Sequence, residues 1–199
     1  PNFVEVFFSL GLNYSNIQQH EMAIKYFKQV LKYRPTDAEA NFNIGSIYLD
    51  KDETGKANAY FKKALELNPH DAEAHCNLGK LFLDRHLTGE ALSHLEQSLE
   101  IYPDHIILLS NLGVVFEQLG EIETAFKYYE RALKINPEFI EGRFNLSLLQ
   151  LSNGFISEGF KNYESRWEYD EFPSPRRQFS IPRWSGESLQ SKNILLWAE

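Results

Sequence analysis

The chain has 199 residues and a formal net charge of −8, with 43% hydrophobic and 24% charged residues. This composition is ordinary for a soluble globular protein of one or two domains. The acidic excess argues against nucleic acid as the main partner, because binding to phosphates needs a basic face. No apolar run reaches the roughly 18 residues that a membrane-spanning helix needs, so we expect no membrane partner either.

Four kinds of residue recur along the chain with a period of 34 residues. They are the prolines Pro35, Pro69, Pro103 and Pro137, the glycines Gly11, Gly45, Gly79 and Gly113, the alanines Ala23, Ala57, Ala91 and Ala125, and the large residues Phe27, Phe61, Leu95 and Tyr129. Four marks that agree at one period indicate a repeated supersecondary unit.

Counted from Val4, five copies follow one another, at 4–37, 38–71, 72–105, 106–139 and 140–173. In each copy we expect a first helix with apolar residues at helical spacing, a polar turn, and a second helix that ends before the proline. Proline cannot continue a helix, so the chain must turn there. The glycine and alanine allow two antiparallel helices to approach closely, and the large residue fills the space beside them.

This order of glycine, alanine, aromatic residue and proline at a period of 34 resembles the tetratricopeptide repeat. The resemblance implies an all-α fold, a right-handed superhelix (α-solenoid) of five helix pairs. Because one pair cannot bury its own apolar face, stacked neighbours supply a continuous core and leave an inner, concave groove.

The fifth copy departs from the pattern, since Ser147 replaces the glycine, Gly159 replaces the alanine and Glu171 replaces the proline. Its aromatic residues nevertheless keep a helical stripe. We interpret 140–169 as a last helix pair that docks against something other than a sixth repeat, or that caps the array. Self-association through this copy or through the tail is a further possibility, and would give a mass that depends on concentration.

The stretch 174–199 is predicted to be a linker followed by the first strand of another domain. Its apolar run, 194–198, has the length of a buried strand. Between Tyr163 and Leu196 the sequence resembles the junction to a C-terminal glycosyltransferase domain, as in O-linked N-acetylglucosaminyl transferase-like tetratricopeptide proteins. The resemblance lies in the motif YESRW at 163–167 and in Trp184, Gly186, Leu189, Lys192 and the strand-like ILL at 194–196, although Ser191 stands where that family has glycine.

Asparagines also recur with the period of 34, two places before each glycine or its replacement, as Asn43, Asn77, Asn111 and Asn145. Residues at −4, +3 and +7 share their helix face. We therefore predict a polar stripe toward the groove. Its further candidate residues are Glu39, Glu73, Lys80, Asp50 and Asp84.

An asparagine amide carries donors and an acceptor, so a row of them can bind the backbone of an extended peptide. The groove of O-linked N-acetylglucosaminyl transferases is similar and implies the same role here. The alternative is that asparagine is frequent at this position whatever the repeat binds. Since acidic residues outnumber the single Lys80 on the stripe, we expect a neutral to basic peptide or protein segment rather than a C-terminal carboxylate.

No catalytic, cofactor or metal site is predicted. The six histidines fall mostly in turns and on polar faces, and neither they nor Cys76 have ligand spacing. One cysteine is compatible with a reducing compartment, and PNFVEVFFSLG does not resemble a signal peptide, so we expect a cytoplasmic protein and interpret the start as a cut within a longer chain. Two functions stay open: the substrate-recruiting arm of a glycosyltransferase-like protein, and a freestanding adaptor without linked catalysis.

Overall fold

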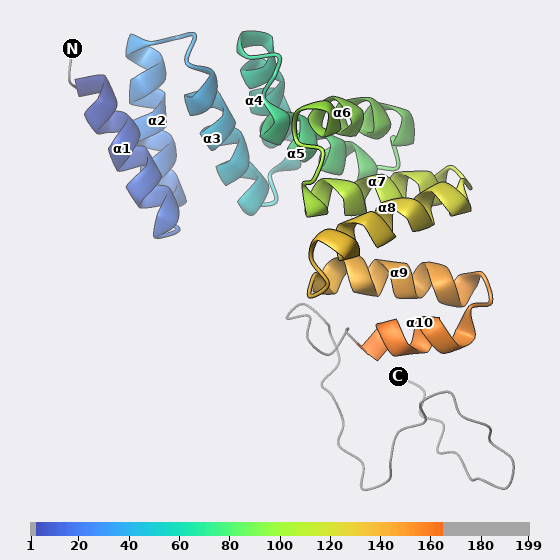
Figure 1. Ribbon diagram of the computed structural model, residues 1–199. Helices are drawn as coiled ribbons and strands as arrows, with labels where there is room; N and C mark the ends of the chain where they lie inside the picture. Colours follow the sequence, from blue (N-terminus) through green and yellow to red (C-terminus); the bar gives the residue numbers. More distant parts are fainter. Residues whose placement is uncertain (1–2, 165–199) are drawn as a thin grey trace, which may run out of the picture. The chain divides into compact units, whose positions relative to one another are not determined.

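A computed structural model describes residues 3–164, and this part of the chain consists of helices without strands (Figure 1). The helices are α1 (Phe3–Asn16), α2 (His20–Tyr33), α3 (Ala38–Asp50), α4 (Thr54–Leu67), α5 (Ala72–Leu83), α6 (Thr88–Ile101), α7 (Ile106–Gln118), α8 (Ile122–Ile135), α9 (Ile140–Ser152) and α10 (Ile156–Tyr163). The all-α class and the succession of antiparallel helix pairs are therefore confirmed. The predicted linker and strand of 174–199 lie outside the described residues.

The chain divides into two compact units, 1–103 and 104–199. In the described residues the first unit contains α1 to α6 and the second contains α7 to α10. Helices α3, α5, α7 and α9 begin at 38, 72, 106 and 140, the first residues of the predicted copies. None of the helices within 3–164 is long and apolar enough to cross a membrane.

Side chains just before the first helices of three copies stabilise the helix ends. Oδ1 of Asp37 accepts a hydrogen bond from the Ala40 amide at 2.8 Å, and Oδ1 of Asp71 accepts one from the Ala74 amide at 3.0 Å. At the same place in the fourth copy, Nδ1 of His105 accepts from the Leu108 amide. Each side chain satisfies an amide that a helix N-terminus leaves without a backbone partner.

The turn within each copy has one backbone conformation. A residue with φ between 56° and 84° follows each first helix, and the next amide bonds back to a carbonyl of that helix's last turn. This is the Schellman arrangement, in which a left-handed residue ends the helix. Glycine occupies the left-handed position only at Gly120 and Gly154, and the other three are Gln18, Asp52 and His86.

The recurring glycines and large residues pack against each other as the sequence predicts. A Cβ atom placed on Gly45 would lie 2.8 Å from the ring of Phe61, and one on Gly113 would lie 2.5 Å from the ring of Tyr129. Gly11 meets Phe27 and Gly79 meets Leu95 in the same way. All four large side chains are fully buried. In these four pairs the two helices therefore approach so closely that a residue with a side chain would not fit at the glycine position.

A second contact joins the two helices of every copy at one repeat position. In the first four copies it is a stack of two rings, formed by Tyr14 with Tyr26, Tyr48 with Tyr60, Phe82 with His94, and Phe116 with Tyr128. In the fifth copy the stack is replaced by a hydrogen bond of 2.9 Å from Asn162 Nδ2 to Gln150 Oε1. The fifth pair thus keeps the contact with different chemistry.

One histidine lies in the core, whereas the sequence predicts that the histidines fall mostly in turns and on polar faces. His75 is buried, its Nε2 lies 3.1 Å from the carbonyl oxygen of Pro69, and its Nδ1 lies 2.9 Å from Nδ1 of His94. Since a carbonyl only accepts, Nε2 of His75 carries a proton, and in the neutral ring Nδ1 accepts from His94. Burial, followed by the nearby His75 and Lys62, lowers the pKa of His94.

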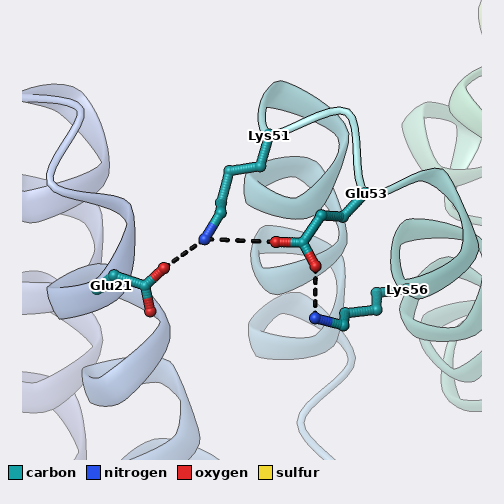
Figure 2. A network of polar contacts seen from close by, with 4 residues as sticks. All are labelled: Glu21, Lys51, Glu53 and Lys56. Carbon is teal, nitrogen blue, oxygen red and sulfur yellow. Dashed lines mark hydrogen bonds and ion pairs between the residues drawn. The ribbon is translucent and has the colours of Figure 1, made fainter.

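A network of four charged side chains joins the first two copies on the surface (Figure 2). The ammonium group of Lys51 bonds to Glu21 of α2 and lies 3.4 Å from a carboxylate oxygen of Glu53, and Lys56 bonds to the other oxygen of Glu53. Hydrogen bonds with Lys51 and with Lys56 lower the pKa values of Glu21 and Glu53, respectively. The pKa of Lys51 is raised, chiefly by its hydrogen bond with Glu21.

We expect replacement of Lys51 by methionine to flatten the acid side of the stability profile. A carboxylate whose pKa is lower in the folded state contributes stability above its unfolded pKa, and that contribution is lost as the pH falls through the folded value. Free energies of unfolding measured between about pH 5 and pH 3 will therefore fall less steeply in Lys51→Met than in the native sequence. Lys28→Met, at an exposed lysine of α2, serves as control. Equal slopes in all three proteins would contradict the network.

Candidate functional site

The predicted polar stripe of the first unit lies on α3 and α5. We call it the asparagine face, and define it as Glu39, Asn43, Ser46 and Asp50 on α3 with Glu73, Asn77, Lys80 and Asp84 on α5. Both asparagines and Ser46 are half-buried, whereas every charged residue of the face is exposed. Other sides of the same helices hold the buried residues Ile44, Ile47, Leu78 and Leu81. The face is therefore accessible to a ligand.

The two asparagines of this face differ in their hydrogen bonding. Nδ2 of Asn43 donates to the carbonyl oxygen of Glu39, one turn earlier in the same helix, at 2.8 Å. This bond occupies part of the amide with its own backbone. For the Asn77 side chain no hydrogen bond is found within residues 3–164, so its donors and acceptor are both open to a ligand. Asn77 is thus the better-placed member of the pair.

The two asparagines of the second unit also differ. Asn111 on α7 is 6% exposed, and its buried Nδ2 has no hydrogen-bond partner in the described part of the chain. Asn145 on α9 is half-buried, and its Nδ2 donates to Ser110 Oγ of α7 at 3.2 Å. The equal spacing in the sequence therefore produces four amides in four different environments.

Acidic groups surround the α3 end of the asparagine face. The pKa of Glu39 is raised, first by partial burial and then by the negative charges of Asp37, Asp71 and Glu5. Glu5 itself forms an ion pair of 2.5 Å with Arg34. The neighbouring carboxylates disfavour further negative charge and would attract a cationic ligand here.

A hollow of about 440 Å³ opens in the second unit between α7, α8 and α9. Its lining consists of Val114, Glu117, Gln118, Tyr129, Asn145 and Leu148. The buried Tyr129 donates its hydroxyl hydrogen bond to Oε2 of Glu117 at 3.2 Å. Burial and then the charge of Glu117 raise the pKa of Tyr129, so the phenol stays protonated and holds the carboxylate. The hollow thus combines apolar walls with one oriented carboxylate.

Sequence reasoning missed Glu117 and the part that Tyr129 plays beside it. A signal was present, because the repeat position of Glu117 is leucine in three other copies, as Leu49, Leu83 and Leu151. A carboxylate at a position where three of the five copies carry leucine indicates a local function or a local partner. Here the partner is the tyrosine hydroxyl, which Leu95 of the previous copy lacks.

The asparagine face and the hollow can both bind by hydrogen bonds and charge. The face offers amides and carboxylates on adjacent helical turns, which suits the alternating donors and acceptors of an extended backbone. The hollow offers a cavity of side-chain size with an acceptor inside it.

Comparison with protein families agrees with this architecture. The profile described as tetratricopeptide repeat matches residues 36–104 and 70–138, and a second profile of the same description matches 4–37. Together these matches span well over half of the chain. No curated protein matches the chain.

Solved structures with the same arrangement of helix pairs include a crystal structure of MamA, which has 25% sequence identity and a TM-score of 0.68, with 78% of this chain and 91% of that chain covered. A MamA fragment from Desulfovibrio magneticus RS-1 has 19% identity, a TM-score of 0.75 and coverages of 86% and 99%. YrrB, described as a TPR protein with an unusual peptide-binding site, has 16% identity, a TM-score of 0.67 and coverages of 80% and 82%. By its matched repeats and its fold, the chain belongs to the tetratricopeptide repeat family.

Proposed function

We propose that this protein is an interaction scaffold, and that its asparagine face binds an extended peptide segment of neutral to basic character. The exposed, predominantly acidic composition of that face carries the proposal. Glu39, Glu73, Asp50 and Asp84 are opposed by Lys80 alone among its charged side chains. A basic segment gains attraction from these carboxylates, whereas an acidic one is repelled.

Hydrogen bonding to the peptide backbone is the second element of the proposal. The Asn77 amide provides a donor and an acceptor on the exposed side of α5, and Asn43 keeps its side-chain oxygen as an acceptor. Such groups read the backbone rather than the side chains, so the face tolerates many sequences. The similarity in fold to YrrB, which is described as binding a peptide, supports this use of the helix pairs.

Replacement of Asn77 by alanine tests the proposal. A random decapeptide library is passed over the immobilised protein, and the retained peptides are sequenced and titrated by fluorescence anisotropy. We expect Asn77→Ala to weaken their binding about fivefold, the effect of one lost hydrogen-bonding group. Its free energy of unfolding is expected to change by less than about 0.5 kcal/mol, since the side chain lies at the surface.

Gln97→Ala is the matched control, because Gln97 is an exposed amide on the second helix of the same copy. It is expected to bind the retained peptides as the native sequence does. A marked loss of stability in Asn77→Ala, or equal binding by both variants, would show that the asparagine is structural. Failure to retain any peptide would overturn the proposed function.

We further propose that this scaffold recruits substrates for a glycosyltransferase-like domain in the same protein. The motifs between Tyr163 and Leu196 support the proposal through their resemblance to the junction of such proteins. The intact mass and C-terminal peptides of the native protein test it. A continuation of some hundreds of residues that opens on a glycine-rich loop would support the recruiting arm, and a stop within a few residues after 199 would favour the freestanding adaptor.

A further inference from the structure

We propose that the hollow of the second unit is a pocket for a lysine or arginine side chain of a peptide ligand. This inference rests on the proposed peptide-binding function and specifies which side chain the protein selects. The asparagine face explains how a backbone could be held, whereas the hollow is a separate cavity on α7, α8 and α9.

The walls of the hollow suit the aliphatic part of such a side chain. Val114 of α7 is half-buried, and Leu148 of α9 is 42% exposed, so both present apolar surface that a ligand can cover. At the same repeat position the first unit carries Leu12, Ser46 and Lys80, so the two copies that precede the second unit are polar where the second unit is apolar. Lysine and arginine bury their methylene stems on surfaces of this kind.

The polar groups of the hollow suit the charged end. Oε2 of Glu117 accepts one hydrogen bond, from the Tyr129 hydroxyl, and a carboxylate has capacity for several more. Within residues 3–164 no lysine or arginine forms an ion pair with Glu117. Asn145 donates through Nδ2 to Ser110, which leaves its carbonyl oxygen as an acceptor beside the hollow. The polar lining is thus rich in acceptors.

Other occupants fit less well. A purely apolar side chain would cover the carboxylate of Glu117 without giving it a new partner, which costs free energy. An acidic side chain would be repelled by Glu117 and by Glu141, whose charge also contributes to the raised pKa of Tyr129. A cation with an aliphatic stem satisfies both the walls and the carboxylate.

Replacement of Glu117 by glutamine removes the charge while keeping an oxygen that can accept from the Tyr129 hydroxyl, so the variant is expected to fold normally. The random decapeptide library again serves as the probe. The native protein is expected to retain peptides enriched in lysine and arginine. Glu117→Gln is expected to bind a retained lysine peptide about tenfold more weakly, and to bind its norleucine counterpart with unchanged affinity. Glu130→Gln, at an exposed carboxylate of α8, is the control and is expected to match the native protein.

The outcomes separate the two proposals. The proposed pocket would be overturned if the retained peptides were not enriched in lysine and arginine, or if Glu117→Gln retained peptides with the same enrichment. Either result would leave the proposed peptide-binding function intact. Retention of no peptide would overturn both. Methyl NMR locates the site independently, because butylguanidinium is expected to shift the methyl signals of Val114 and Leu148 in the native protein and to shift them far less in Glu117→Gln. Absence of the shift in the native protein would overturn the pocket.

Discussion

Replacement of Phe61 by alanine is expected to lower the free energy of unfolding by about 3–5 kcal/mol, the usual cost of removing a large buried ring. Phe61 is fully buried, lies against the backbone of Gly45, and packs on the ring of Phe42 with a centroid distance of 5.7 Å. Its loss leaves a cavity between the two helices, because Gly45 has no side chain to fill the space. Chemical denaturation of the native and variant proteins measures the effect.

A double-mutant cycle with Gly45→Ala tests the physical cause. Alone, Gly45→Ala is expected to cost about 1–3 kcal/mol, because its methyl group would lie 2.8 Å from the Phe61 ring. In the Phe61→Ala background the same methyl group enters the vacated space, so the two costs will not add. Phe3→Ala is the control, since Phe3 is 73% exposed. Additive costs for the two changes would show that the residues are not in contact.

The period of 34 residues allowed the fold to be predicted in detail, because each recurring residue has a local mechanical role. Proline ends a second helix whatever its surroundings, and glycine permits a close approach wherever a large residue faces it. The structure accordingly places Phe27, Phe61, Leu95 and Tyr129 against the four glycines. The buried His75 was not predictable, since its position depends on a hydrogen bond to a loop carbonyl and on His94 of the other helix.

The candidate site was predictable only in outline. Helical spacing identifies which residues share the asparagine face, and their exposure follows from it. It does not fix the direction of a side-chain amide, which is set by neighbours that differ between copies. Asn43 turns back to its own helix, whereas Asn145 reaches Ser110, a small residue at the position of Phe42 and Phe144 in other copies. The hollow likewise contains a residue that departs from the repeat, Glu117, and a repeat pattern conceals such exceptions.

Replacement of Ala91 by leucine is expected to destabilise the protein by about 1–3 kcal/mol through overpacking. Ala91 is fully buried on α6, and its carbonyl oxygen lies 3.4 Å from the position that a Cβ atom on Gly79 would take. The backbones of α5 and α6 thus approach closely here and leave no room for three further carbon atoms.

Ser93→Leu is the control for this overpacking, because Ser93 is exposed on the same helix and leucine favours helix formation more than serine does. Chemical denaturation is expected to show Ser93→Leu at or slightly above the stability of the native protein, and Ala91→Leu clearly below it. Both variants add a leucine to α6, but only Ala91→Leu adds it between two helices. A difference in their stability therefore reports overpacking rather than the effect of leucine on the helix itself. Equal stability of the two variants would mean that α5 and α6 do not pack closely at Ala91 in solution. Close helix packing would then not explain why this repeat position carries a small residue.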